Sequence, residues 1–315
     1  TSWRSSARLT KATGCAQDQT KFFENFGVAY RTEFFNSIGW NRPAGRFDVL
    51  FMLLSRRRRS RSQPIYLMDY FLEVYGSLPR AGPGSDELTR RAFEMIPSLP
   101  ESPRILDVGC GPGMQTVELL RSCGSTVVAL DFLPEMIDRV NAAAGSAGVS
   151  ERLEAVVQDM RQMTFPESSF DVIWSEGAIY NLGFEAGLRE FRRLVKPGGY
   201  VAVSEAVWLK PNPPSAVVEF WRDYPEIDTV DVKLEVTKQV GYEVLGHFVF
   251  PASAWVDQYY EPMEKRIAEK ENDWNGIPEA EAVLSEARNE ISMFRHNSDY
   301  FSYAFFVMRS GLHVG

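Results

Sequence analysis

The sequence predicts an α/β protein with a doubly wound, mostly parallel sheet that helices cover on both faces. From residue 104 onward, short apolar runs alternate with segments whose apolar residues recur at helical spacing. An acid or a glycine follows several of these runs, as at the carboxyl edge where open parallel sheets bind ligands. The expected strands are 104–108, 126–130, 153–157, 170–174, 200–206, 242–250 and 303–309.

A glycine-rich turn joins the first expected strand to a helix. Residues 104–113 read Arg-Ile-Leu-Asp-Val-Gly-Cys-Gly-Pro-Gly, so Gly109, Gly111 and Gly113 stand at alternate positions. Glycine permits unusual backbone dihedrals and lets a ligand approach bare backbone. The dinucleotide fingerprint needs its third glycine where this chain has Met114. The spacing therefore favours S-adenosylmethionine over NAD as the ligand.

The second expected strand ends in an acid that supports this ligand. Asp131 lies 22 positions after Gly109. A carboxylate at this place accepts hydrogen bonds from both ribose hydroxyls of an adenosyl group. A solvated turn aspartate is the alternative for an isolated residue, but the glycine turn at this spacing favours the ribose role.

These segments resemble the class I S-adenosylmethionine-dependent methyltransferases, over residues 66–309. Residues 104–113 look like the first motif of that family, and residues 130–131 look like its ribose-binding position. Residues 158–160 resemble its adenine-contacting segment, and residues 194–200 resemble its turn before strand five. Within the family, a bacterial group that acts on small molecules is most similar, through residues 80–85, 174–181 and 299–303.

The resemblance implies a Rossmann-like sheet of seven strands. By that resemblance the last strand is antiparallel and lies beside strand five. A helical insertion, residues 251–298, stands between strands six and seven, and its aromatic residues indicate either packing against the sheet edge or a lid over an acceptor pocket. The expected helices are 66–75, 86–96, 114–122, 134–144, 184–194, 230–240, 253–270 and 278–294, with one turn near 160–163.

The glycine turn is expected to hold the methionine part of the ligand. Gly109, Gly111 and Gly113 would wrap that part, and Asp107 stands at the base of the turn. The carboxylate of Asp107 would accept a hydrogen bond either from the ammonium of the ligand or from amides of the loop.

Four further residues are expected on the cofactor side. Phe132 follows the ribose-binding acid, and Ser175 ends the fourth expected strand. By resemblance, Asp159 accepts from the adenine amino group and Met160 packs on the ring. No cluster with metal-ligand spacing accompanies them, because the three histidines are widely separated, so no metal is expected.

Residues 175–181 follow strand four and are the best acceptor-side candidates. Glu176 is a tentative catalytic residue: it would act as a general base, orient the acceptor or face the sulfonium, with a capping role as the alternative. Tyr180 is the second, through its hydroxyl or its ring, with core packing as the alternative. Glu205 ends strand five and would face the same crevice, while Arg80 lies in a segment that resembles a family segment which folds back near the cofactor.

Composition separates two parts of the chain. Residues 1–67 contain 12 Lys and Arg against 4 Asp and Glu, whereas the remainder contains 22 against 38. An acidic body would repel a phosphate backbone, which argues against a nucleic-acid substrate. The three cysteines show no paired spacing, which is typical of a reducing compartment and favours a cytoplasmic location. No apolar run reaches the length of a membrane span.

The first 65 residues differ from the rest, and residues 66–310 form the expected methyltransferase domain. Three interpretations of residues 1–65 stay open: a poorly ordered extension or upstream stretch with a natural start at Met68, a targeting segment, or a basic patch that binds nucleic acid or membrane.

The predicted function is methyl transfer from S-adenosylmethionine to a small molecule by in-line displacement, with catalysis from proximity and electrostatics. The alternatives on the same fold are an aminopropyltransferase and a protein that binds S-adenosylmethionine without chemistry. A nicotinamide dehydrogenase is disfavoured by Met114.

Overall fold

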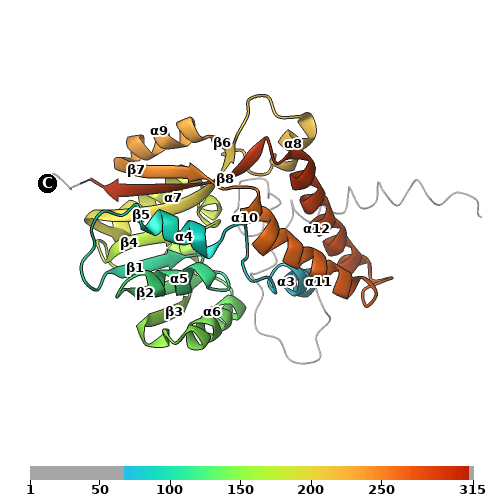
Figure 1. The fold of residues 1–315 in the computed structure, drawn as a ribbon, viewed down its shortest axis with the longest axis horizontal. Coiled ribbons are helices and arrows are strands. Elements are labelled where there is room, and N and C mark those ends of the chain that lie inside the picture. Colours follow the sequence, from blue (N-terminus) through green and yellow to red (C-terminus); the bar gives the residue numbers. More distant parts are fainter. Residues whose placement is uncertain (1–66, 312–315) are drawn as a thin grey trace, which may run out of the picture. The chain divides into compact units, whose positions relative to one another are not determined.

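One mixed β-sheet organises residues 67–311, the part of the chain that the computed structural model describes (Figure 1). Its strand order is β3-β2-β1-β4-β5-β8-β7, with the short β6 paired to β5. The strands are β1 (Arg104–Val108), β2 (Thr126–Asp131), β3 (Leu153–Val157), β4 (Phe170–Ser175), β5 (Val195–Trp208), β6 (Asp228–Thr229), β7 (Tyr242–Val249) and β8 (Phe301–Ser310). The last strand is antiparallel and lies beside β5, as the resemblance implies.

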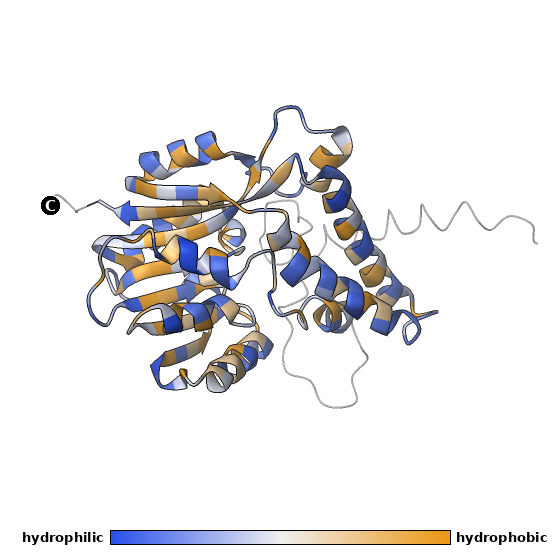
Figure 2. Ribbon diagram, in the orientation of Figure 1, coloured by the Kyte–Doolittle hydropathy of each residue, from blue (hydrophilic) through white to orange (hydrophobic). Residues whose placement is uncertain are grey.

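Helices cover both faces of the sheet. On one face lie α4 (Asp86–Phe93), α5 (Met114–Ser122) and α6 (Pro134–Ala147), and on the other lie α7 (Phe184–Leu194) and α9 (Val230–Val240). Successive strand residues face opposite sides, so Ile105 packs in one apolar cluster and Leu106 in the other. Figure 2 shows mostly apolar central strands between helices that carry both polar and apolar residues.

A second group of helices stands at the carboxyl edge of the parallel strands. It contains α3 (Leu67–Val74), α10 (Ser253–Trp255), the π-helical turn η4 (Val256–Tyr260), α11 (Glu261–Glu271) and α12 (Pro278–Asn297). Figure 1 shows α3, α11 and α12 side by side, in agreement with their mutual contacts. The chain enters this group after β7 and returns where Phe301 pairs with Trp208 at the end of β5. The segment between β7 and β8 therefore lies at the carboxyl edge of the parallel strands.

Several element boundaries differ from the predicted ones. The expected single helix over 253–270 contains the turn η4, and α8 (Ser215–Phe220), for which no helix was expected, begins directly after Pro214. The turn expected within residues 194–200 lies almost wholly inside β5. Phe170 pairs with Val195, and the register then shifts so that Val172 pairs with Tyr200. The three remaining helical turns are η1 (Ser150–Arg152), η2 (Met160–Gln162) and η3 (Ile179–Asn181). Residues 1–66 and 312–315 lie outside the described part, so the extension over 1–65 and the domain boundaries stay predictions.

At Gly113, both the backbone conformation and a close neighbour exclude a side chain. Its φ is 92°, and a Cβ there would lie 2.4 Å from Val140 Cγ2 and 2.9 Å from Val140 Cα on α6. We expect Gly113→Ala to lower the free energy of unfolding by about 2–4 kcal/mol, because left-handed backbone strain and overpacking add.

Gly148 provides the matched control. Its φ is 69°, and nothing lies within 4 Å of the position of its Cβ. Gly148→Ala should cost only about 1–2 kcal/mol, the strain of the left-handed backbone. Equal losses for the two variants in urea unfolding would contradict the close approach of the turn to α6.

Candidate functional site

The glycine turn between β1 and α5 is held against the neighbouring strand. The amides of Gly109 and Cys110 both donate to the carbonyl oxygen of Leu130, at 2.8 and 2.9 Å. Gly109, Gly111 and Gly113 have φ values of 76°, 51° and 92°, which glycine adopts without strain. The three alternate glycines that the sequence singles out are therefore required by the backbone path itself.

Asp131 joins the end of β2 to this turn. Its Oδ2 accepts from the Gly111 amide at 2.9 Å, and its Oδ1 accepts from the Leu133 amide at 3.0 Å. Burial raises the pKa of Asp131, and these backbone hydrogen bonds oppose the rise. A carboxylate offers about four lone-pair sites, so acceptor capacity remains for a ligand. Phe132, the next residue, is partly buried.

Asp107 lies fully buried at the base of the turn. Its Oδ2 accepts from Thr116 Oγ1 at 2.6 Å, whereas its Oδ1 has no hydrogen-bond partner within residues 67–311. Burial raises the pKa of Asp107 to about 7, and the charges of Glu176 and Asp131 add to the rise. A buried carboxylate oxygen without a donor favours a cation or a donor group beside it.

Met160 and Ala178 lie against the glycine turn from two different loops. A Cβ on Gly109 would approach Ala178 Cβ to 2.5 Å and Met160 Cε to 3.2 Å. Asp159 caps η2 through the Arg161 amide and forms an ion pair with the Arg161 side chain at 2.7 Å. Although burial opposes it, these contacts lower the pKa of Asp159.

Glu176 is held by donors from three elements. Its Oε1 accepts from Thr89 Oγ1 at 2.7 Å and from Trp174 Nε1 at 2.8 Å, and its Oε2 lies 3.3 Å from the Arg80 guanidinium. Burial raises the pKa of Glu176, while Arg80 and the two neutral donors lower it. Arg80 also pairs with Asp86 at 2.6 Å. The carboxylate therefore ties residues 80–89 to the end of β4.

The sequence did not indicate two of these partners. Thr89 lies in an expected helix and Trp174 ends an expected strand, and neither was a candidate site residue. The sequence also did not indicate that Ala81 lies against the glycine turn, where a Cβ on Gly111 would lie 3.3 Å from Ala81 Cβ. Only the resemblance of residues 80–85 pointed to this segment.

The remaining candidate residues make contacts in different parts of the structure. Ser175 is buried and donates to the Val108 carbonyl oxygen at 3.0 Å, which ties β4 to β1. The Tyr180 ring packs edge-on against Tyr224, with centroids 5.9 Å apart. Glu205 accepts from the Tyr224 hydroxyl and pairs with Lys233 of α9 at 3.0 Å. Burial raises the pKa of Glu205, and Lys233 opposes the rise.

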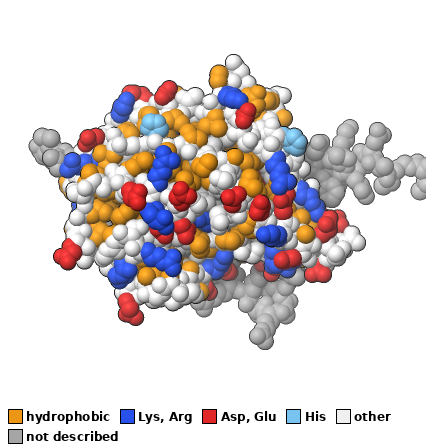
Figure 3. Space-filling view, viewed as in Figure 1, with side chains coloured by type: hydrophobic (Ala, Val, Ile, Leu, Met, Phe, Trp, Pro, Cys, Tyr) orange, Lys and Arg blue, Asp and Glu red, His pale blue; other side chains and the backbone are white. Residues whose placement is uncertain are grey.

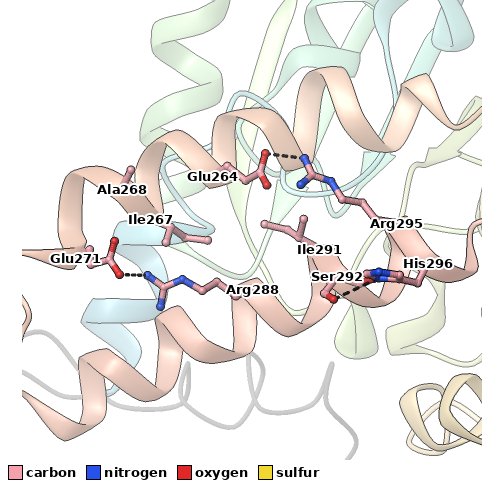
Figure 4. Close-up of a pocket in the computed structure, with 9 residues that line it drawn as sticks. All are labelled: Glu264, Ile267, Ala268, Glu271, Arg288, Ile291, Ser292, Arg295 and His296. Carbon is pink, nitrogen blue, oxygen red and sulfur yellow. Dashed lines mark hydrogen bonds and ion pairs between the residues drawn. The ribbon is translucent and has the colours of Figure 1, made fainter.

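A surface groove lies between α11 and α12, apart from the glycine turn (Figure 4). Its floor is apolar, and the ion pairs Arg288–Glu271 and Arg295–Glu264 span it at 2.7 and 2.8 Å. The lining residues are Glu264, Ile267, Ala268, Glu271, Arg288, Ile291, Ser292, Arg295 and His296. None of them belongs to the glycine turn or to the loops that contact it.

The molecular face in Figure 3 carries basic and acidic side chains interspersed with apolar ones. Within the described residues, no helix is both long and apolar enough to cross a membrane. In the same part of the chain, no three His, Cys, Asp or Glu side chains gather as a metal site would require.

Comparison with known proteins points to one domain type. Residues 105–199, from β1 into β5, match the family model of a methyltransferase domain. A sterol 24-C-methyltransferase of Gibberella zeae is 29% identical over 153 residues, which cover 46% of this chain and 40% of that protein. A demethylmenaquinone methyltransferase of Mycolicibacterium gilvum is 34% identical over 123 residues, which cover 39% of this chain and 50% of that protein. The chain thus spans half or less of the length of these curated relatives.

A solved structure shares the fold over most of its length. The S-adenosylmethionine-dependent methyltransferase from Geobacter sulfurreducens, in complex with S-adenosylhomocysteine, has a TM-score of 0.67 to this chain at 17% identity. The alignment covers 76% of this chain and 97% of that one. At this identity the likeness shows the fold alone.

The buried pair of Arg80 and Glu176 should behave as one unit. Each side chain is only 5% exposed, so removing either partner leaves the other buried without its counter-charge. We expect Arg80→Met and Glu176→Gln each to cost about 3–5 kcal/mol in urea unfolding, and the double variant to cost clearly less than the sum.

Arg189 and Glu185 form the matched exposed pair on α7, with side chains 59% and 55% exposed. Their removal should change stability by about 0.5 kcal/mol or less. Additive losses for the buried pair would show that Glu176 and Arg80 act independently.

Proposed function

We propose that this chain, a member of the class I S-adenosylmethionine-dependent methyltransferases, transfers a methyl group from S-adenosylmethionine to a small-molecule acceptor. The observation that carries the proposal is the pair of carboxylates around the glycine turn. Asp131 keeps acceptor capacity beside the turn, and Asp107 presents a buried oxygen without a donor at its base. The residues on which this argument depends lie within or beside the stretch that matches a methyltransferase domain.

The donor-side residues fit S-adenosylmethionine. Asp131 would hold the ribose hydroxyls with its unused lone pairs, and Asp107 Oδ1 would accept from the ammonium of the methionine part. Met160, whose methyl group lies beside Gly109, would pack on the adenosyl group. The bare glycine backbone leaves no Cβ between the turn and its ligand.

The bound donor supplies a methyl group on a positively charged sulfur. The chain contributes position and exclusion of water, since in-line displacement needs an aligned nucleophile rather than a covalent intermediate. The three donors of Glu176 support a positioning role that differs from the expected catalytic ones: it fixes the loop of residues 80–85 and the segment after β4. Tyr180, on η3 after that segment, stays the acceptor-side candidate.

The proposal includes a small acceptor and a cytoplasmic location. The excess of acids over bases in residues 68–315 disfavours a nucleic-acid acceptor. The unpaired cysteine spacing is typical of a reducing compartment.

Calorimetric titration of the full chain tests the donor. S-adenosylmethionine and S-adenosylhomocysteine should bind, and decarboxylated S-adenosylmethionine and NADH should bind at least tenfold more weakly. Preference for the decarboxylated compound would instead support aminopropyl transfer, and preference for NADH would support a dehydrogenase.

Asp131→Asn should weaken S-adenosylmethionine binding about 10- to 100-fold, because the charge-assisted hydrogen bonds to the ribose are lost. Glu135→Gln removes the same charge from the exposed start of α6 and should leave the affinity unchanged. Unfolding of the ligand-free variants checks that the turn is still formed. An unchanged affinity in Asp131→Asn would refute the ribose assignment.

The raised pKa of Asp107 predicts that the affinity for S-adenosylmethionine depends on pH. Its pKa of about 7 means that the carboxyl is largely protonated below pH 7 in the free protein. A cation beside Oδ1 favours the ionised form, so binding releases a proton and the affinity should rise up to about tenfold per unit between pH 5.5 and 7. Asp107→Asn should abolish this slope. A slope that survives the substitution would assign the proton to another group.

The raised pKa of Asp107 also changes the free energy of unfolding. Because the folded-state pKa lies above the usual 3.8, ionisation of Asp107 opposes folding. This destabilisation of the folded state is absent below about pH 4 and grows as the pH rises to 7.

A further inference from the structure

The carboxylate proposed to hold the methionine part of the donor is closed off from solvent. Asp107 is 0% exposed, although its Oδ1 has no hydrogen-bond partner within residues 67–311. A ligand therefore reaches this oxygen only after an element that covers the turn has moved. Loops that open and close commonly serve this purpose in enzymes.

One connecting loop lies against the glycine turn. Residues 75–85 join α3 to α4, and we call them the strap (Figure 1). A Cβ on Gly111 would lie 3.3 Å from Ala81 Cβ, so the strap meets the turn at Ala81. No helix or strand lies within the strap. Separate contacts, rather than a ladder of backbone hydrogen bonds, therefore hold it in place.

The half of the strap that leads into α4 is attached at two points. The Arg80 guanidinium pairs with Glu176 at 3.3 Å and with Asp86 at 2.6 Å. The Gly84 amide donates to the carbonyl oxygen of Ala254 on α10 at 3.0 Å. This half is thereby fixed to β4 and to the helices at the carboxyl edge.

The half that follows α3 is held by Arg139 of α6. Its guanidinium donates to the carbonyl oxygens of Gly76 and Leu78, the second at 2.7 Å. Burial lowers the pKa of Arg139, and no carboxylate among the described residues pairs with it. The planar guanidinium presents donors in a fixed fork, so one side chain spans both carbonyl groups.

Arg139 stands on the same base as the donor site. Its helix begins shortly after Asp131, and the next residue, Val140, lies against Gly113 of the turn. The contacts of Arg139 thus connect the strap to the element that packs on the glycine turn.

Resting on the proposed donor site, we infer that Arg139 is a positioning residue that holds the strap closed over the bound donor. With Arg139 in place the strap is attached at both ends. Without it the strap stays attached only at the end near α4, and the open form becomes more populated. Donor entry and product release then become faster, and the bound state loses affinity mainly through its dissociation rate.

The dissociation rate of S-adenosylhomocysteine from the full chain tests the inference. Radiolabelled S-adenosylhomocysteine is bound to the protein and then chased with an excess of unlabelled compound. Arg139→Met keeps an apolar stem but removes the guanidinium, and it should raise the dissociation rate about tenfold or more. A rate within twofold of that of the unaltered chain would overturn the inference.

Arg152 provides the matched control. Its guanidinium also spans two carbonyl oxygens, those of Cys123 and Ser125, at 3.0 and 2.9 Å. Both precede β2, at the edge of the sheet opposite the glycine turn. Arg152→Met should leave the dissociation rate within twofold. An equal rise in both variants would assign the effect to a general loss of stability and would refute the role of Arg139.

Two further measurements do not depend on how well Arg139→Met folds or binds. Ala81 is exposed, and Ala81→Gly removes its contact with the turn while Arg139 stays in place, so the dissociation rate should rise about threefold. In the ligand-free chain, amide hydrogen exchange over residues 75–85 should be faster in Arg139→Met than in Arg152→Met. An unchanged rate in Ala81→Gly, or equal exchange of the strap in the two arginine variants, would contradict a closed strap held by Arg139.

Binding to the unaltered chain distinguishes the two proposals. If S-adenosylhomocysteine binds and its dissociation is the same in Arg139→Met, this inference fails and the proposed function stands. If neither S-adenosylmethionine nor S-adenosylhomocysteine binds, both fail.

Discussion

The buried carboxylate of Glu176 is the interaction on which the arrangement of the site depends. An ionised group without contact with water needs hydrogen bonds, and this one takes them from Arg80, Thr89 and Trp174. Those donors belong to the segment before β1, to α4 and to β4. One electrostatic requirement thus places the loop of residues 80–85 over the glycine turn, where Ala81 meets Gly111.

The carboxyl edge of the sheet collects negative charge. Asp107, Asp131, Glu176 and Glu205 all lie there, and burial raises the pKa of each. Backbone amides or cations contact three of them, but one oxygen of Asp107 and one of Glu205 have no hydrogen-bond partner within the described residues. A site built in this way favours a positively charged ligand, because such a ligand compensates charges that the fold has already removed from water.

The helices between β7 and β8 complete the edge. The segment begins after β7 and ends where β8 pairs with β5, so its helices stand at the carboxyl edge rather than on a face of the sheet. The π-helical turn η4 places Tyr259 and Tyr260 on consecutive positions near Glu290 of α12. The Trp255 ring of this segment packs on Phe301 and Tyr303 of β8, as the packing alternative implies, and the lid role stays a prediction.

The sequence by itself determined the local parts of this protein. The glycines at 109, 111 and 113 and the acid at 131 predicted the strand, turn and helix, because backbone dihedrals and short-range periodicity are properties of neighbouring residues. The position of β8 followed from resemblance rather than from spacing. Only the tertiary structure decided that Glu176 is enclosed by Thr89 and Trp174, that Ser175 ties two strands together, and that Tyr303 packs on Trp255. These contacts join residues far apart in the chain, and burial and hydrogen bonding between such residues depend on how the elements pack.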